Sequence, residues 1–321
     1  MAGIIGGSTF GVAKHVRLHA VKVLDCGGSG SYSQVIEGVD WVSANALHPA
    51  VANMSLGGGF YQPLNDAVAA SIASGITYAV AAGNSDLNAC NYSPASTPTA
   101  ITVGSVGNAS NLNAPISNSR SSFSNTGACL DIFAPGAFIR SACAVAGQFG
   151  GECAGPANRA VVTLSGTSMA TPHVAGVAAL ILQKVPGATP LGVRNLIVTY
   201  ATPGVPFRGA GSPNRQLFAG GIPALSSNAA PEPIRCPAGV TVSGALSLGG
   251  QPLAGKIVRV FFNPDGSAPT VAKGTAVTSA TGRYAKAESQ SVDGIWFAKF
   301  DGSALAGAKQ SAADHVDCVN R

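Results

Sequence analysis

The sequence is poor in charged residues and has no long apolar run. Charged residues make up 10% of its 321 positions and hydrophobic residues 46%, so a large buried core is easily filled. No apolar stretch reaches the roughly 18 residues that indicate a membrane-spanning helix, and we expect no membrane association. The net charge of +5 comes from scattered basic residues, which argues against a nucleic-acid-binding protein.

A zinc-binding motif and an export signal are also missing. None of the seven cysteines forms a C-x-x-C pair, so disulfides are favoured over zinc. Disulfides indicate an oxidising compartment, and the odd count leaves one cysteine without a partner. Yet Met1–Gly7 has neither the basic start nor the apolar core of an export signal. We therefore expect secretion only for a full-length product.

Strand and helix patterns alternate through the first two thirds of the chain. Alternation of this kind predicts βαβ units, a parallel sheet and an α/β fold. Ala2–Gly7 reads as the tail of a buried helix. The expected strands are Val16–Leu24, Val51–Leu56, Ile76–Ala82 and Ile101–Val106, and the expected helices between them are Ser33–Ala46 and Leu64–Ser74.

The character of the sequence changes near residue 222. We assign residues 1–222 to the α/β domain and the Pro- and Ser-rich residues 223–236 to a linker. Residues 237–321 contain short alternating runs separated by turn signals, which predict a small all-β sandwich.

One stretch, Gly166–Gly176, reads Gly-Thr-Ser-Met-Ala-Thr-Pro-His-Val-Ala-Gly. Val161–Leu164 before it predicts a buried strand, and the small apolar residues after it predict a helix to Leu182. Ser168 then lies at a strand-to-helix turn, where free N–H groups and the helix dipole favour negative charge. We expect Pro172 in the first helical turn, which tolerates its missing N–H. The alternative is an ordinary Ser N-cap.

This stretch resembles the nucleophile segment of subtilisin-like serine proteases, and the likeness to their proteinase K and aqualysin branch runs from Ala2 to Ala219. The resemblance implies a three-layer fold around a parallel sheet. It implies that Ser168 is the nucleophile and that Asn84, in Ala-Ala-Gly-Asn, donates its side-chain amide to the oxyanion. Read alone, Asn84 is an ordinary turn residue.

Two further segments match those that bracket an extended substrate in the family. Such a peptide pairs with exposed backbone, and glycine allows its close approach. Plain turn glycines are the alternative. The implied substrate-binding residues are Gly28, Ser29, Gly30, Tyr32, Ser55, Leu56, Gly57 and Gly58. The matching pocket walls carry no charge, so we expect apolar or broad side chains at the cleaved position.

The resemblance also implies a structural calcium ion, and no cofactor for catalysis. Its ligands would be the carbonyls of Pro98 and Ala100 and the carboxylate of Asp131, since oxygen ligands suit this cation. A buried Asp capping a turn is the alternative for Asp131. We predict three disulfides, of which the first rests on aqualysin-like relatives: Cys90–Cys129, Cys143–Cys153 and Cys236–Cys318.

The base and carboxylate of a catalytic triad are not found. None of the five histidines precedes Gly-Thr as the family's catalytic His does. His173 lies five residues after Ser168, which turns it about 140° away on a helix. The likeness begins just after the family's catalytic His, and Cys26 matches a cysteine whose partner lies just before that His. We therefore expect an inactive or weakly active fragment whose gene product begins upstream.

Three functions follow from these observations. The first is a serine endopeptidase, monomeric, that acts on peptides or proteins. The second is a non-catalytic remnant that binds peptides or partners. The third places the main role in the C-terminal sandwich, as an adhesion or substrate-binding module of unknown ligand.

Overall fold

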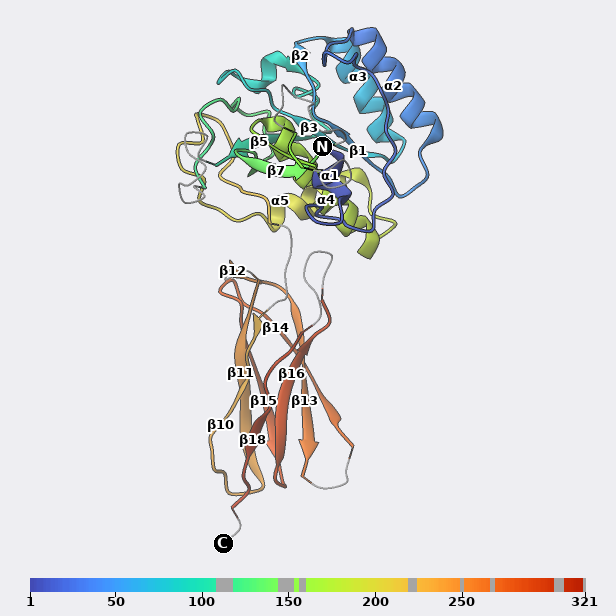
Figure 1. Cartoon of the computed structure of the whole chain (residues 1–321). Helices are drawn as coiled ribbons and strands as arrows, with labels where there is room; N and C mark the ends of the chain where they lie inside the picture. Colours follow the sequence, from blue (N-terminus) through green and yellow to red (C-terminus); the bar gives the residue numbers. More distant parts are fainter. Residues whose placement is uncertain are drawn as a thin grey trace. The chain divides into compact units, whose positions relative to one another are not determined.

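The computed structural model describes residues 1–107, 118–143, 153–155, 160–218, 224–248, 251–265, 269–302 and 309–319. The chain divides into two compact units, Met1–Ala219 and Gly220–Arg321, drawn with blue to yellow and with orange to red ribbons (Figure 1). Each unit is described by itself below. No helix in the described ranges has the length and apolar character needed to cross a membrane.

Unit 1 is built on a sheet of four strands in the order β1-β3-β5-β6. All three pairings are parallel, which confirms the parallel sheet predicted from the alternating pattern. The predicted strand at 101–106 has the observed bounds. The strands predicted at 51–56 and 76–82 are each shorter in the structure. The bounds are β1 Val51–Met54, β3 Thr77–Ala81, β5 Ile101–Val106 and β6 Ile132–Pro135.

Helices α2 (Tyr32–Asn45) and α3 (Gln62–Ala73) pack together on one face of this sheet. Their buried residues form one core cluster with Tyr78 and Val80 of β3. Alternate residues of a strand point to opposite faces, so Ala79 faces the other side. There α4 (Thr167–Lys184) packs across all four strands, and α1 (Ala2–Gly6) and α5 (Pro190–Thr199) pack against α4.

Two short strand pairs and a 3₁₀ turn lie outside the four-stranded sheet in the described part of unit 1. Strand β2 (Gly58–Gly59) pairs with β4 (Tyr92–Ser93), directly after the turn η1 (Ala89–Asn91). Strand β7 (Ile139–Ala142) pairs with β8 (Val161–Leu164) as an antiparallel ribbon. The expectation of a buried strand before the nucleophile turn is therefore wrong in part: in this two-stranded ribbon only the second residue of β8 is buried.

The predicted strand Val16–Leu24 is not formed. These residues pair with no other strand of the described structure. Their side chains nevertheless pack, because Val16 lies against the α1 residue Gly6 and Val23 against the α2 residue Gly38. An apolar, β-branched run favours a strand only where a neighbouring strand accepts its backbone hydrogen bonds.

Unit 2 is all-β, as predicted, and consists of two five-stranded sheets. In the first sheet β11 pairs with β9, β10, β12 and β15, and in the second the order is β14-β13-β16-β17 with β18 beside β16. The first sheet comprises β9 Ala224–Leu225, β10 Asn228–Ala230, β11 Ala238–Leu248, β12 Gln251–Pro252 and β15 Arg283–Gln290. The second comprises β13 Ile257–Pro264, β14 Val271–Val277, β16 Gly294–Phe300, β17 Lys309–Gln310 and β18 Asp314–Val316.

The expected linker at 223–236 is wrong as drawn. Strands β9 and β10 fall inside it, and both pair with β11. Ala229 is 1% exposed and Ile234 3%, so this segment contributes to the core of unit 2. Its proline- and serine-rich composition describes the turns between short strands as well as it describes a linker.

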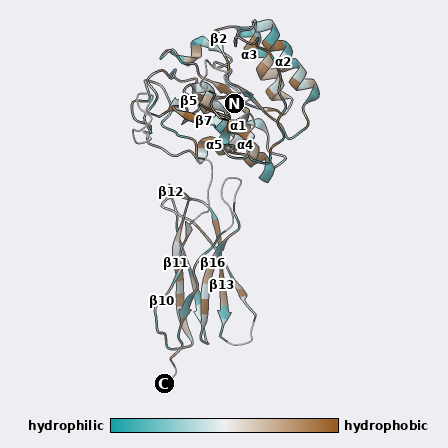
Figure 2. Cartoon of the chain, in the orientation of Figure 1, coloured by the Kyte–Doolittle hydropathy of each residue, from teal (hydrophilic) through white to brown (hydrophobic). Residues whose placement is uncertain are grey.

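The core of unit 2 follows from alternation along its strands. In β13, Val258 and Val260 are buried while Arg259 between them is exposed. Figure 2 shows apolar and polar residues alternating along these strands. The fully buried Trp296 donates its Nε1 hydrogen to Gln290 Oε1 at 2.6 Å, which satisfies both polar groups inside the apolar core.

All three predicted disulfides are present. They link Cys90 to Cys129, Cys143 to Cys153, and Cys236 to Cys318. Cys26 is the free cysteine and is exposed, as expected for the unmatched member of an odd set.

Candidate active site

The nucleophile turn lies where the sequence places it. Helix α4 begins at Thr167, so Ser168 is the second residue of its first turn and is half-buried. Its Oγ donates a hydrogen bond to the carbonyl of Ser55 at 3.2 Å. In the described structure no imidazole is hydrogen-bonded to Ser168. Among the described residues, its hydroxyl is therefore bonded to a carbonyl and not to a basic side chain.

Pro172 is the sixth residue of α4, which corrects its expected place in the first turn. In an unbroken helix residue 172 would donate its N–H to the carbonyl of Ser168, and proline cannot. That carbonyl accepts the hydroxyl of Ser55 instead, at 2.8 Å. Ser55 and Ser168 thus exchange two hydrogen bonds, and the free helical carbonyl ties the two predicted segments together.

Asn84 follows β3 and reaches the same turn. Its Oδ1 accepts the backbone N–H of Thr167 at 2.8 Å and the hydroxyl of Thr167 at 2.9 Å. Because the oxygen is held on Thr167, the Nδ2 group of the carboxamide is left to donate elsewhere. A Cβ placed on Gly166 would lie 3.5 Å from this nitrogen, so Nδ2 lies beside the nucleophile turn.

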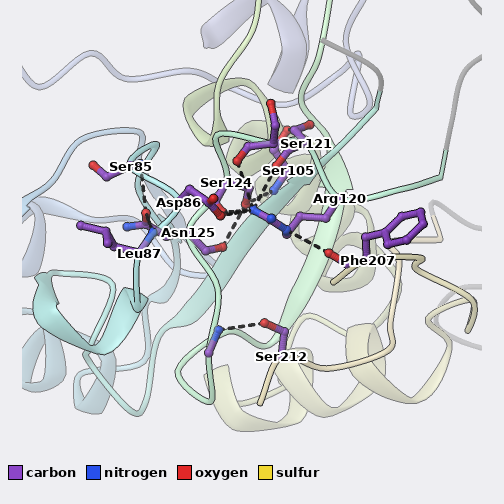
Figure 3. A network of polar contacts seen from close by, with 12 residues as sticks. Ser85, Asp86, Leu87, Ser105, Arg120, Ser121, Ser124, Asn125, Phe207 and Ser212 are labelled. Carbon is purple, nitrogen blue, oxygen red and sulfur yellow. Dashed lines mark hydrogen bonds and ion pairs between the residues drawn. The ribbon is translucent and has the colours of Figure 1, made fainter. Parts of the chain in front are cut away.

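Asn125 holds the loop that carries Asn84 (Figure 3). This side chain is fully buried, and its Nδ2 donates to the carbonyl of Ala82 at 2.8 Å. Its Oδ1 accepts the N–H groups of Ser85 and Leu87, each at 3.0 Å. One carboxamide therefore anchors the chain on both sides of Asn84.

Arg120 supplies a second anchor for the same loop (Figure 3). Its Nη1 donates to Asp86 Oδ1 and to the carbonyl of Ser124, both at 2.7 Å, and its Nε donates to the carbonyl of Phe207 at 3.0 Å. The Arg120 side chain is 15% exposed, so these charge-assisted bonds are only partly screened. Neither Asn125 nor Arg120 was singled out from the sequence, because nothing in a Ser-rich loop marks which polar residue turns inward.

Replacing Asn125 by Ala should destabilise unit 1 by about 2–3 kcal/mol, because the buried carbonyl of Ala82 and two N–H groups lose their partner. Asn125→Asp keeps the Oδ1 bonds, so its stability should lie between those of the wild type and Asn125→Ala. Chemical denaturation followed at Trp41 measures the change. Ser122→Ala, at an exposed position of the same loop, is the control and should shift stability by less than about 0.5 kcal/mol. Equal stability of all three variants would refute this anchoring role.

The two substrate segments are linked through Tyr32. Its hydroxyl donates to the carbonyl of Gly59 at 2.7 Å, and its ring stacks on Tyr61 with centroids 4.7 Å apart. A Cβ on Gly58 would lie 2.3 Å from the Tyr32 hydroxyl, so this position has room only for glycine. Tyr32 thus brings its own segment to the one containing Gly58, and substrate binding there stays a prediction.

Gly28, Ser29 and Gly30 form a closed turn on Asp25. The Asp25 carboxylate accepts the N–H of Ser29 at 2.9 Å, and the Ser29 carbonyl accepts the N–H of Asp25 at 2.8 Å. The N–H groups of Ser29 and Gly27, both donating to this carboxylate, lower the pKa of Asp25 and keep it ionised. Asp25 therefore orients this turn through backbone N–H groups.

His173 is a structural residue of α4. Its Nδ1 is 2.9 Å from the carbonyl of Met169, and burial lowers the pKa of its ring below the usual value. A neutral imidazole bonded to its own helix contributes nothing to Ser168. This geometry agrees with the expectation drawn from helical spacing.

The predicted calcium ligand Asp131 is paired with an arginine. Asp131 Oδ2 accepts the N–H of Thr102 at 2.8 Å, two residues after Ala100 in the chain. However, Asp131 Oδ1 accepts both Nε, at 3.0 Å, and Nη2 of Arg194. In the described part of the chain no three His, Cys, Asp or Glu side chains gather into a possible metal site. The donor set at Asp131 therefore does not fit a calcium ion while Arg194 is bound.

With this geometry in view, the likeness to known proteins decides the family. The family model described as "Subtilase family" matches residues 1–220. The chain belongs to the subtilase family. The match ends with unit 1, so unit 2 lies outside it.

Curated relatives and a solved structure agree with this assignment. The chain is 51% identical over 220 residues to the extracellular serine proteinase of Thermus sp. (strain Rt41A), and 50% identical over 218 residues to the alkaline serine exoprotease A of Vibrio alginolyticus. The crystal structure of a cold adapted subtilisin-like serine proteinase superposes with a TM-score of 0.60 at 49% identity, covering 68% of this chain and 72% of that one.

The coverage of these relatives is partial. Each of the two curated matches covers 68% of this subtilase, but only 49% of the Thermus proteinase and 37% of the Vibrio protease. The chain thus spans about half or less of the length of these relatives. Unit 1 has the subtilisin-like fold, with a parallel sheet and helices.

Proposed function

We propose that this subtilase chain supplies the nucleophile and the oxyanion donors of a serine endopeptidase. The arrangement at the start of α4 carries the proposal: Ser168 is half-buried in the first helical turn, and Asn84 is held on Thr167 with its Nδ2 beside that turn. Ser168 Oγ would attack the peptide carbonyl carbon. Asn84 Nδ2 and the N–H of Ser168 would donate to the oxyanion, each such donor being worth about 3–4 kcal/mol of barrier.

The proton of Ser168 needs an acceptor that the described residues do not provide. The hydroxyl donates to a backbone carbonyl, which is too weak a base to take the proton. We propose that the general base and its orienting carboxylate enter on a polypeptide segment that pairs with the free edge of β1. Because the chain is similar to an extracellular serine proteinase, we also propose that this protein is secreted.

Three features of unit 1 support a segment at this edge. β1 is the outermost strand of its sheet, so one row of its backbone groups is unpaired. Asn53 in β1 has a buried Oδ1 without a hydrogen-bond partner. The β-branched run Val16–Leu24 pairs with no strand in the described structure. A strand between this run and β1 would satisfy all three.

Covalent labelling with a peptidyl phosphonate carrying an apolar residue next to phosphorus tests the nucleophile. We expect slow formation of an adduct on Ser168, located by peptide mass mapping, and no adduct in Ser168→Ala. Ser226→Ala, in unit 2, should label like the wild type. An adduct of equal yield on the Ser168→Ala variant would contradict the proposal.

A non-catalytic role is the second candidate. Ser168 donates a hydrogen bond to a carbonyl and to no basic side chain among the described residues, which favours this role for the chain on its own. It predicts saturable binding of apolar peptides, measured by fluorescence anisotropy, together with no adduct after prolonged exposure to the phosphonate.

A further inference from the structure

The ion pair between Asp131 and Arg194 has no part in the catalytic proposal. Asp131 lies directly before β6, and its side chain is 9% exposed. Thr102 donates to one carboxylate oxygen, and Arg194 donates twice to the other. Both oxygens are therefore occupied by donors from the protein itself.

Arg194 comes from α5, a helix that the sequence does not mark as part of any site. Thr189 caps α5 by accepting the N–H of Gly192 at 3.1 Å, which places Arg194 in the second turn. From there its side chain reaches the sheet and joins α5 to the β5–β6 pair. The positive charge of Arg215 also acts on Asp131. Two guanidinium groups thus face a single buried carboxylate.

Calcium needs six to eight oxygen ligands at about 2.3–2.6 Å. At Asp131 an ion would have to approach a carboxylate whose two oxygens already accept N–H groups of Thr102 and Arg194, against the charge of Arg194 and Arg215. An open cavity of about 460 Å³, lined in part by Asp131, Arg194 and Arg215, gives ions access to this place. Access therefore does not limit binding, whereas charge and occupied oxygens do.

We infer that Arg194 is a built-in cation that occupies the place of a calcium ion at Asp131 and makes this part of the fold independent of calcium. The ion and the guanidinium compete for the same carboxylate. Removing the guanidinium should therefore expose a weak calcium site formed by Asp131 with the carbonyls of Pro98 and Ala100.

Thermal unfolding of the full chain in calcium chloride and in EDTA tests this competition. For each protein, the shift in Tm between calcium and EDTA is compared with the shift in the same protein carrying Asp131→Asn. In the wild type the two shifts should be equal. In Arg194→Met, Tm in EDTA should fall, and calcium at about 10 mM should raise it by several degrees if the exposed site binds in the 10⁻⁴–10⁻³ M range. Arg194→Met/Asp131→Asn should lose that response.

Two controls separate charge from contact. Arg215→Met removes the same charge without breaking the Asp131 pair, so it should behave like the wild type. Arg194→Lys keeps a cation at the site and should show little response to calcium. An Asp131-dependent rise in the Tm of the wild type would overturn the inference, as would an Arg194→Met variant with no response. If Arg194→Met fails to fold, the wild type is compared with Asp131→Asn. A rise in Tm with calcium that is present in the wild type and absent in Asp131→Asn would then overturn the inference.

Discussion

The 321-residue chain alone should hydrolyse a peptide anilide about 10⁴–10⁶-fold more slowly than the same chain joined to polypeptide that supplies a His base and an Asp. The proposed nucleophile Ser168 donates a hydrogen bond to the Ser55 carbonyl, and the proposed oxyanion donor Asn84 is held on Thr167. Without a base, only substrate binding and the oxyanion hole lower the barrier.

The measurement is kcat/KM of three proteins: the chain alone, a fusion to the segment of a complete subtilase that carries these two groups, and the fusion with Ser168→Ala. The last variant should fall to the level of the chain alone. Comparable rates for the chain and the fusion would show that Ser168 finds its base within this chain. They would refute the missing-base argument without touching the role of Ser168.

Opening the Cys236–Cys318 disulfide should cost unit 2 about 4–5 kcal/mol, the largest stability effect we expect from any one crosslink here. The two cysteines are 82 residues apart and close almost the whole unit into one loop. Cross-linking ends so far apart removes much of the freedom of the unfolded chain, and this loss grows with loop length.

Tryptophan fluorescence can follow the two units separately. The chain has two tryptophans: Trp296 is fully buried in unit 2, and Trp41 is half-exposed in unit 1. In a Trp41→Phe background, Cys236→Ala/Cys318→Ala should move the denaturation midpoint strongly. Cys143→Ala/Cys153→Ala, which opens a loop of 10 residues in unit 1, is the matched control and should leave the Trp296 transition in place. An unchanged midpoint for the first pair would contradict the prediction.

The sequence predicted unit 1 best where local pattern and tertiary context agree. The strand Ile101–Val106 is buried at all six positions and lies between two neighbours, so its β-branched residues form the element they favour. Val16–Leu24 carries a similar pattern and forms no strand. The difference lies in the neighbour that accepts hydrogen bonds, which a single segment does not encode.

At the site, residue identities were easier to predict than their contacts. Ser168 and Asn84 could be named from motifs, whereas the hydrogen bonds of Asn84 to Thr167 and of Ser168 to Ser55 appear only in the structure. The pairing of Asp131 with Arg194 could not be foreseen, because 63 residues separate them and a lone Arg on a helix face has many possible partners. Anchors such as Asn125 depend on burial, which only the folded chain determines.

The missing helical hydrogen bond at Pro172 has a consequence for the evolution of this sequence. The Ser168 carbonyl is satisfied by the Ser55 hydroxyl because proline leaves it free. Losing the hydroxyl alone would strand that carbonyl, whereas a residue with an N–H at position 172 would compete for it. Positions 55 and 172, 117 residues apart in the numbering, therefore form one epistatic unit. An exchange at either position should be accepted more readily in a background that has already changed the other.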